Sequence, residues 1–395
     1  MPDEARSPPT ADAGGGMGEM PAQGLGVGRS REPDARAGTE GGVPHGSDAP
    51  IKRISVVIAN YNYGRYVGQA IDSALALEWD DVEVIVVDDG STDDSREVID
   101  RYLDRVTAVY QENATQRVAR NRGFELTTGD VVIHLDSDDV LYPSLAREVA
   151  RAWHPGISKV QVQMQRIDEG GHPVGGVFPT FRDEPTPEHI RHWAQRTTAY
   201  PTPPGSGNVY SREFLERIFP LDDSCGAATD SACLAAAPFL GDVVTIARPL
   251  VGYRVHGENM SDMTADFRRF PRAVERARQR RLYAHRVTGT AMDERALSRS
   301  RELLQLRVAA HRLVPDVRAL PDESLWRLLR DSVLSPVHPG PESLASRVQV
   351  LLWCLATLLA PRELAEHLVR LRYRRDASGV GGRLAAGVRA VRRPM

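Results

Sequence analysis

Short apolar runs alternate with helix-like segments over residues 54–136. Four runs rich in branched apolar side chains occupy residues 54–59, 82–88, 106–112 and 131–136. Between them, apolar positions recur at helical spacing, which predicts the order β-α-β-α-β-α-β. Continuous apolar strands separated by amphipathic helices indicate an α/β fold with a mainly parallel central sheet sandwiched by helices.

Polar residues gather directly after each of these four strands. The segments read NYNYG, DDGSTD, ENATQR and DSDD in chain order. Ligands of parallel α/β sheets bind outside the carboxyl ends of the strands. The four loops are therefore predicted to form one binding rim.

The pattern after residue 143 is mixed and then becomes helical. A helix is expected over 143–153. Apolar and polar residues alternate over 159–168, as in a strand with one face exposed to solvent. Pro-rich residues 201–207 are expected to form a mobile loop. The other predicted elements are helices at 186–196, 212–218 and 229–240, a strand at 242–256, and only helices from 263 onward.

Composition divides the chain into three parts. Residues 1–50 are rich in Gly, Pro, Ala and charge, so they cannot bury enough apolar surface to fold and are predicted to be a disordered N-terminal segment. Residues 51–262 are predicted to be the α/β domain. Residues 263–395 are predicted to be a basic, helical C-terminal region.

Charge differs sharply along the chain. Residues 1–262 carry 24 basic and 40 acidic side chains, whereas residues 263–395 carry 26 and 13. The basic region could face an anionic membrane or pair with the acidic part of the same chain. Residues 345–375, an apolar helix broken at Pro361 with arginines on both sides, could lie on a membrane or pack on the neighbouring domain. No nucleic acid partner is expected, because the region lacks interleaved aromatic residues.

The cysteines and apolar runs indicate a cytoplasmic protein. The three cysteines have no C-x-x-C spacing, so neither a disulfide framework nor a thiolate metal site is expected. The N-terminus lacks the apolar core of a secretory signal, and the longest apolar run, 350–360, is too short to span a bilayer. Contact with the inner face of the membrane remains compatible with this pattern.

Three carboxylates, Asp136, Asp138 and Asp139, follow the fourth strand. Like charges at such spacing raise each other's pKa unless a cation or hydrogen-bond donors neutralise them. A divalent metal would do so. The alternative is that these acids only cap the helix that begins near Pro143.

The motifs together resemble a known family. The segments SVVIANYN, VIVVDDGSTD, ARNRG and HLDSDD occur in the order, spacing and strand-end positions of the family 2 inverting glycosyltransferases. That family has the GT-A fold, which binds nucleotide-diphosphate sugars. The resemblance covers roughly residues 54–260.

The resemblance implies roles for the residues on the rim. Tyr61 would pack near the nucleobase and Asp89 would contact it. The cluster of Asp136, Asp138 and Asp139 would contact the ribose and, through a divalent metal, the diphosphate. All-oxygen ligation favours Mg²⁺ or Mn²⁺ over zinc.

Further positions match the family less fully. Arg117 and Arg120 would lie against the donor sugar and its phosphates. Asp230 would be the catalytic base, although Thr229 stands where the family usually has Glu, and a plain helix cap is the alternative for Asp230. His256 would approach the diphosphate or the metal, or serve as a structural hydrogen-bonding group.

The function implied is transfer of a sugar, with inversion, from a nucleotide-diphosphate sugar to an acceptor hydroxyl. A UDP-sugar is the expected donor, and a saccharide, a lipid-linked molecule or another hydroxyl compound is the expected acceptor in polysaccharide or glycoconjugate synthesis. Two alternatives stay open. One is a catalytically silent nucleotide-sugar-binding module, and the other is a nucleotidyltransferase of the same fold.

Overall fold

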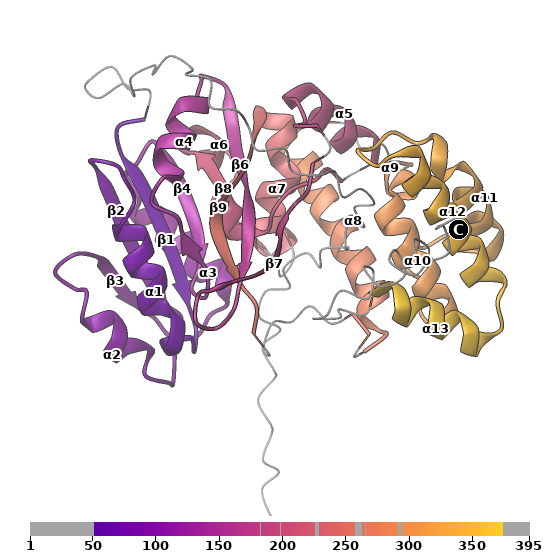
Figure 1. Cartoon of the computed structure of the whole chain (residues 1–395), viewed down its shortest axis with the longest axis horizontal. Coiled ribbons are helices and arrows are strands. Elements are labelled where there is room, and N and C mark those ends of the chain that lie inside the picture. The colour runs from indigo at the N-terminus through magenta and orange to yellow at the C-terminus, as the bar shows by residue number, and fades with distance from the viewer. Residues whose placement is uncertain are drawn as a thin grey trace, which may run out of the picture.

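The computed structural model describes residues 51–373 except 182, 198, 226–228, 257–262, 265, 291–292 and 294. A nine-stranded sheet with flanking helices lies on one side of the molecule, and helices from residue 269 onward lie on the other (Figure 1). The prediction of a disordered segment at residues 1–50 falls outside the described residues.

The first half of the sheet is parallel, as predicted. Its strands lie in the order β3-β2-β1-β4, and each pair of neighbours is parallel. The strands are β1 (Ile54–Asn60), β2 (Val82–Asp88), β3 (Thr107–Tyr110) and β4 (Val131–Asp136). The crossover helices are α1 (Gly64–Leu75), α2 (Ser95–Asp100) and α3 (Gln116–Leu126).

Helices cover both faces of this half because strand side chains alternate between the faces. Ile54, Val56 and Ile58 of β1 pack in a core that includes α1. Val57 points to the opposite face, where a Cβ on Gly123 of α3 would lie 2.3 Å from its Cγ1. Glycine at 123 therefore allows α3 to approach the sheet closely.

The second half of the sheet is mixed. β8 is antiparallel to both β4 and β6, β6 is parallel to β9, and β5 and β7 add antiparallel edges. β5, β7 and β8 were not predicted, because they are short or lie in Gly- and Pro-rich sequence that gives little strand signal. The strands are β5 (Val140–Leu141), β6 (Ile157–Ile167), β7 (Pro173–Phe178), β8 (Asn208–Ser211) and β9 (Asp242–Arg254).

The helices of this half agree with the sequence pattern. They are α4 (Leu145–Ala152), α5 (Pro187–Thr197), α6 (Arg212–Glu216) and α7 (Thr229–Leu240). The segment 201–207, predicted to be mobile, is instead packed: it ends in the 3-10 turn η1 (Gly205–Gly207), all three residues of which are buried. A Cβ on Gly207 would lie 2.6 Å from Cβ of Pro203, so the turn has no spare room.

The described part of the chain after residue 263 contains helices and no strand, as predicted. These helices are α8 (Arg269–Thr288), α9 (Ala296–Arg299), α10 (Arg301–Leu313), α11 (Leu325–Leu334), η3 (Ser335–Val337), α12 (Leu344–Leu359) and α13 (Arg362–Tyr373). α8 joins this region to the sheet: Ala284 packs in the core that contains Phe214, and Tyr283 Oη donates to Ile218 O over 2.9 Å. Within the described residues no helix is long and apolar enough to cross a membrane.

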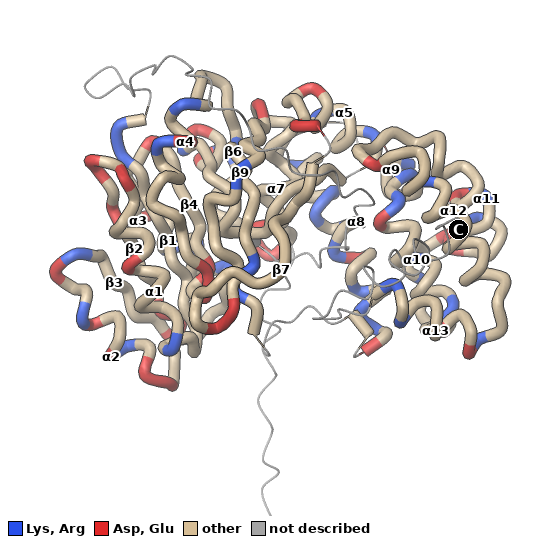
Figure 2. The backbone as a smooth tube through the Cα atoms, viewed as in Figure 1, with Lys and Arg blue, Asp and Glu red and all other residues tan. Residues whose placement is uncertain are grey.

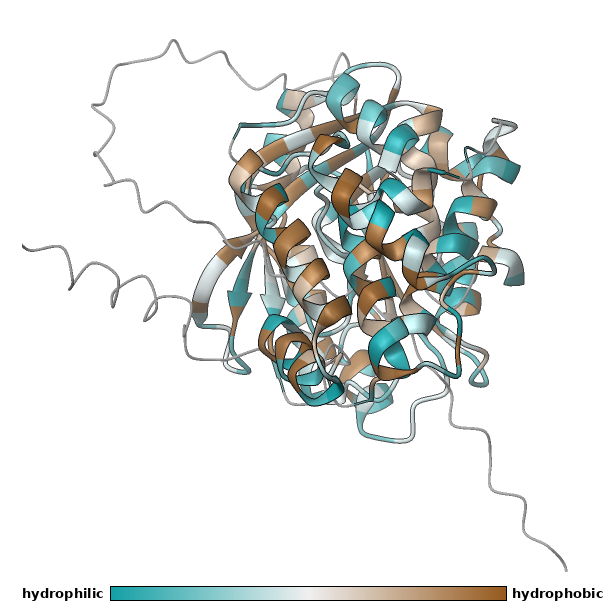
Figure 3. Ribbon diagram, turned by 90° about the vertical axis from the view of Figure 1, so that its right-hand side faces the viewer, coloured by the Kyte–Doolittle hydropathy of each residue, from teal (hydrophilic) through white to brown (hydrophobic). Residues whose placement is uncertain are grey.

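α12 has one packed face and one exposed apolar face. Val350, Cys354 and Leu358 pack with residues of α10 and α11. Leu344 and Leu352 point to solvent. Figure 3, which shows this side of the molecule, has hydrophobic residues along these helices. The break predicted at Pro361 separates α12 from α13.

Part of the basic charge of the C-terminal region lies inside it. Arg307 is fully buried, and its guanidinium pairs with Glu323 at 2.7 Å and with Asp331 at 2.9 Å. Basic and acidic residues are interspersed over the helices in Figure 2. The region is therefore less uniformly cationic than its composition indicates.

Candidate active site

The carboxyl ends of β1, β2 and β4 meet at one edge of the sheet. The strand register pairs Asn60 with Asp88 and Ala59 with Asp136. The polar segments after these strands therefore lie side by side, as the sequence predicted.

Asp88 closes the turn after β2. Its carboxylate accepts hydrogen bonds from Asn60 Nδ2 at 2.9 Å, Ser91 Oγ at 2.6 Å and Ser91 N at 3.0 Å. Gly90 has a φ of 78°, a left-handed conformation in which a side chain would be strained. Hydrogen bonds thus hold the DDGS turn after β2 against the end of β1.

Asp89 holds the loop before α3. Its two carboxylate oxygens accept from Gln111 Nε2 at 2.6 Å, Ala114 N at 2.9 Å and Thr115 N at 3.0 Å. The side chain is buried in this conformation. Contact with a nucleobase therefore stays a prediction, and Asp89 has a structural role as well.

Tyr61 lies on the rim with its side chain exposed. The loop around it is fixed from the β2 side, because Asn62 N donates to Ser91 Oγ at 2.8 Å and Asn62 Oδ1 accepts from Thr92 N at 2.7 Å. Asn62 has a φ of 57°, which Asn tolerates better than most residues. The exposed ring is available to a ligand at this edge.

Asp139 is the buried member of the acidic cluster. Its oxygens accept from Ser206 Oγ at 2.7 Å and from Arg254 N at 3.0 Å. Burial, and then the charges of Asp138 and Asp136, hold the pKa of Asp139 well above its usual range. Ser206 Oγ also accepts from Asp136 N at 3.0 Å, so this serine ties η1 to the end of β4.

Asp138 and His256 form a pair at the mouth of the cluster. His256 Nε2 lies 2.9 Å from Asp138 Oδ2. The imidazole packs against Tyr63, with ring centres 5.8 Å apart, and against Tyr66, at 5.3 Å. The buried imidazole is therefore held in a fixed position beside the carboxylate.

Arg254, which sequence reasoning did not single out, supports this arrangement from below. Its buried guanidinium donates to Asp138 O at 2.7 Å and to Glu169 O at 2.7 Å, and it lies 4.9 Å from the centre of the Tyr66 ring. Arg254 lies two positions before His256, the residue that the resemblance did identify. Nothing in the sequence pointed to Ser206.

Arg120 and Asp136 form the second charged pair. Arg120 Nη2 donates to Asp136 Oδ1 at 2.9 Å. Burial raises the pKa of Asp136 to about 6; Arg120 opposes this shift, and the charges of Asp138 and Asp230 add to it. Although burial opposes it, the charges of Asp136 and Asp230 raise the pKa of Arg120. The structure thus brings Asp230 near this pair.

Asp230 lies in the first turn of α7, where an acid suits the helix dipole. Its Oδ1 accepts from Ser231 N at 2.9 Å. Arg117 points elsewhere: its guanidinium donates to Leu221 O at 3.1 Å and pairs with Asp223. In this conformation Arg117 is tied to the segment before α7, whereas Arg120 faces the acids.

The donor chemistry fits a divalent cation bound together with a phosphate ligand. Within the described ranges, no three acidic, His or Cys side chains form a ready-made metal site. Mg²⁺ and Mn²⁺ need no such cage, because one or two carboxylates and substrate phosphates commonly complete their shell. Asp138 and His256 offer a carboxylate and an imidazole side by side, and the raised pKa values of Asp136 and Asp139 reflect, after burial, charge that a cation would offset.

The sequence comparison agrees with the family that the motifs resemble. Residues 55–219 match the family model described as Glycosyl transferase family 2. Over this range the chain is similar to glycosyl transferase family 2. The family and the sheet together confirm the predicted GT-A fold, with a helical region after it.

Curated relatives are also glycosyltransferases by name. The uncharacterized glycosyltransferase alr2836 of Nostoc sp. (strain PCC 7120) is 36% identical over 214 residues, covering 52% of this chain and 66% of that protein. The putative glycosyltransferase EpsH of Bacillus subtilis (strain 168) is 25% identical over 213 residues, covering 51% and 61%. The chain spans two thirds or less of these relatives.

Two solved structures show a distant likeness in fold. TarS 1–349 of S. aureus in complex with UDP is 14% identical, with a TM-score of 0.45, covering 80% of this chain and 91% of that one. The mannosyltransferase PcManGT of Pyrobaculum calidifontis, in complex with GDP-Man and Mn²⁺, is 18% identical, with a TM-score of 0.46 and 87% of each chain covered.

Proposed function

We propose that the protein transfers a sugar, with inversion, from a nucleotide-diphosphate sugar to an acceptor hydroxyl. The observation that carries the proposal is the convergence of Asp138 with His256, Arg120 with Asp136, and Asp230 at the carboxyl ends of the strands. A UDP-sugar is the proposed donor. The match of residues 55–219 to the family 2 model supports the reaction class.

The donor would lie across the rim. Tyr61 would stack near the base, and Asp89 would accept from a ring N–H once loop 111–115 moves to release one of its oxygens. Asp136 would receive the ribose, and Arg120, with Arg117 if it leaves Asp223, would face the sugar and its phosphates. Arginine suits phosphate because its planar fork of donors matches the oxygens.

Mn²⁺ or Mg²⁺ would be held by Asp138 and His256, and also by Asp139 if its hydrogen bonds to Ser206 and Arg254 open. When bound, the ion supplies positive charge that stabilises the departing nucleoside diphosphate. The chain's own contribution is to keep Asp138 in place, through Arg254 below it and the imidazole beside it.

Asp230 would take the proton of the acceptor hydroxyl as that oxygen attacks the anomeric carbon. A single displacement of this kind inverts the anomeric configuration. The side chain is only partly buried, and the first turn of α7 faces the pair Arg120 and Asp136. A carboxylate needs little adjustment of its pKa to act as a general base.

We assign recognition of the acceptor molecule, and contact with a membrane, to the C-terminal region. We place the transferase domain at residues 51–262 and the helical region at 263–395. The exposed face of α12 carries Leu344, Leu352 and Leu359, which are 70%, 61% and 70% exposed. Residues 374–395, next along the chain, hold six Arg and one Asp. An apolar face followed by a cationic segment suits an anionic lipid surface.

The transferase activity is tested by measuring release of nucleoside diphosphate from a panel of nucleotide sugars, with and without Mn²⁺. The wild type is expected to release it only with Mn²⁺, and Asp230→Asn is expected to lower the rate about 10²- to 10⁴-fold, the usual contribution of a general base. Asp222→Asn, at an exposed acid nearby, is the matched control. Turnover that survives Asp230→Asn removes this residue from the mechanism.

The two alternatives give different results in the same assay. Nucleotide binding without turnover on any acceptor would indicate a silent binding module. Release of pyrophosphate from a nucleoside triphosphate and a sugar phosphate would indicate a nucleotidyltransferase. The chain lacks the Gly-rich basic phosphate loop with which that group usually opens, which favours the first proposal.

A further inference from the structure

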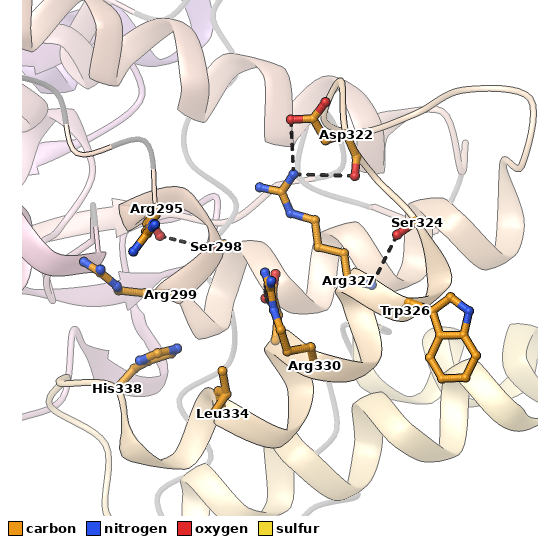
Figure 4. Close-up of a pocket in the computed structure, with 11 residues that line it drawn as sticks. Arg295, Ser298, Arg299, Asp322, Ser324, Trp326, Arg327, Arg330, Leu334 and His338 are labelled. Carbon is orange, nitrogen blue, oxygen red and sulfur yellow. Dashed lines mark hydrogen bonds and ion pairs between the residues drawn. The ribbon is translucent and has the colours of Figure 1, made fainter.

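A cavity lies in the C-terminal helical region, away from the strand ends. Its volume is about 830 Å³. Its walls come from α9 with the residue before it, from α11 with the loop before it, and from His338 after η3 (Figure 4). The proposed transferase reaction uses none of these residues.

Four arginines line this cavity, which we call the arginine pocket: Arg295, Arg299, Arg327 and Arg330. Among the residues that the structure describes, the acidic side chains of the lining are Asp322 and Asp331. The arginines come from α9 with the residue before it and from α11, and the acids come from α11 and the loop before it. Among the described residues of the lining, positive charge therefore exceeds negative charge.

The acids nearby neutralise the arginines incompletely. Asp331 accepts from Arg330 at 3.0 Å but is shared with buried Arg307 at 2.9 Å. Asp322 is 87% exposed and lies 3.5 Å from Arg327, a long and solvent-screened contact. Arg299 pairs with Asp293, which does not line the pocket, at 2.5 Å. Arg295 makes no ion pair with any residue that the structure describes.

The pKa of a neighbouring histidine is lowered by burial and also by these positive charges. Burial lowers the pKa of His338, and the charges of Arg299 and Arg301 lower it further. Arg301 is buried behind the pocket and donates to His338 O at 2.8 Å. The positive charge that disfavours protonation of His338 would attract an anion to the pocket.

The mouth of the pocket is apolar. Trp326, which is 81% exposed, and Leu334 both line it, and both belong to the set of exposed hydrophobic side chains of α11. Figure 4 shows Trp326 at the edge of the group and Arg330 nearer its centre. A ligand with an anionic head and an apolar or ring-shaped neighbour would contact both parts.

We propose that the arginine pocket binds a phosphate group. Several guanidinium groups at one cavity can each offer two parallel N–H donors to phosphate oxygens, which gives both charge and geometric fit. The phosphate could belong to a soluble anion or to a lipid headgroup, because the apolar mouth is compatible with either. The site is independent of the transferase proposal.

The test uses the full chain with EDTA present, so that metal-dependent binding at the strand ends does not contribute. Pyrophosphate is titrated while tryptophan fluorescence is followed, and Trp326→Phe identifies the part of the signal that comes from the pocket. The variant Arg295→Gln/Arg330→Gln removes two pocket charges and leaves the pairs of Arg307 with Glu323 and Asp331 intact. The control, Arg318→Gln/Arg362→Gln, removes two exposed arginines elsewhere.

Saturable binding in the wild type and the control, about tenfold weaker for each pocket arginine removed, supports the site. A second arm compares vesicles of phosphatidylcholine alone with vesicles that also contain phosphatidic acid. Loss of vesicle binding in the pocket variant but not in the control assigns the phosphate to a lipid headgroup, whereas unchanged vesicle binding assigns it to a soluble anion. No binding in either arm, or equal loss in variant and control, overturns the proposal.

Discussion

At the scale of single residues, the acids at the end of β4 have three different environments. Asp139 is buried and bonded on both oxygens, Asp138 faces His256, and Asp136 faces Arg120. The sequence places the three within four positions but does not distinguish them. Their separation depends on side chains from η1, β9 and α3, which come from distant parts of the chain.

The raised pKa of Asp136 gives the stability of the protein a pH dependence. Its pKa is about 6 in the folded state, chiefly through burial, against about 3.9 for an unfolded Asp. Between these values the folded state binds more protons, so this group lowers the free energy of unfolding as pH rises.

Asp136→Asn removes that contribution. Relative to the variant, the wild type is expected to lose stability between about pH 4 and pH 6 and to show no further relative change above that window. Urea unfolding of both proteins in EDTA, at steps of one pH unit, measures this. Parallel stability curves across the window would show that Asp136 titrates normally.

At the scale of elements, the sequence predicted the helices and strands that have a clear periodic pattern, and the polar loops at the strand ends. The parallel strands β1 to β4 and the helix α7 follow local patterns and were predicted closely. The short strand β8 was missed, because its four residues are buried by neighbouring strands rather than by a pattern of their own. The packed loop 201–207 was missed for a related reason: Pro and Gly indicate a turn but do not say what covers it.

The same limit applies to the site. Asp138, Arg120 and His256 were identified from motifs, and the structure places all three at the strand ends. Ser206 and Arg254 act on the acids through tertiary contacts that no local spacing encodes. Asp89 was identified, but the three donors on its carboxylate were not foreseen.

A buried arginine links α10 to α11, beside the apolar packing of the two helices. Arg307 of α10 holds Glu323 and, on α11, Asp331. Arg307→Leu leaves Glu323 buried without its cation and leaves Asp331 with Arg330 alone, so it is expected to destabilise the protein by about 3–5 kcal/mol. Chemical unfolding measures the change, with Arg278→Leu, at a half-exposed arginine of α8, as the control. A loss no larger than that of the control would mean that water or rearrangement replaces the arginine.

At the scale of the whole molecule, the exposed hydrophobic residues are concentrated at the end opposite the first strands. Of the large exposed apolar side chains, most lie on the segment from α11 to α13, and few lie on the sheet (Figures 1 and 3). A surface of this kind usually marks an interaction site. The strand-end site and this apolar surface are therefore separate features of one molecule.

Binding to a membrane is expected to need both the apolar face and the basic end of the chain. The wild type should cosediment with vesicles that contain phosphatidylglycerol and not with phosphatidylcholine alone. Leu344→Ser/Leu352→Ser/Leu359→Ser should bind more weakly because it removes apolar side chains that enter the interface. A chain ending at Tyr373 should also bind more weakly, because each removed arginine near the surface costs about 1 kcal/mol.

The control for the triple variant is serine at two exposed apolar positions elsewhere, Leu103 in the turn after α2 and Val174 in β7. A stable dimer in solution that dissociates in the triple variant, together with no vesicle binding, would assign the face of α12 to a second copy of the chain.

The most direct measurement is calorimetric titration of UDP into the wild type and Asp138→Asn, with and without Mn²⁺, using exposed Asp104→Asn as the control. Tight binding is expected only for the wild type and the control with Mn²⁺, and it should weaken about 100-fold or more without the metal or in Asp138→Asn. UDP binding that is equally strong without Mn²⁺ and in Asp138→Asn would contradict a metal-held diphosphate at the end of β4.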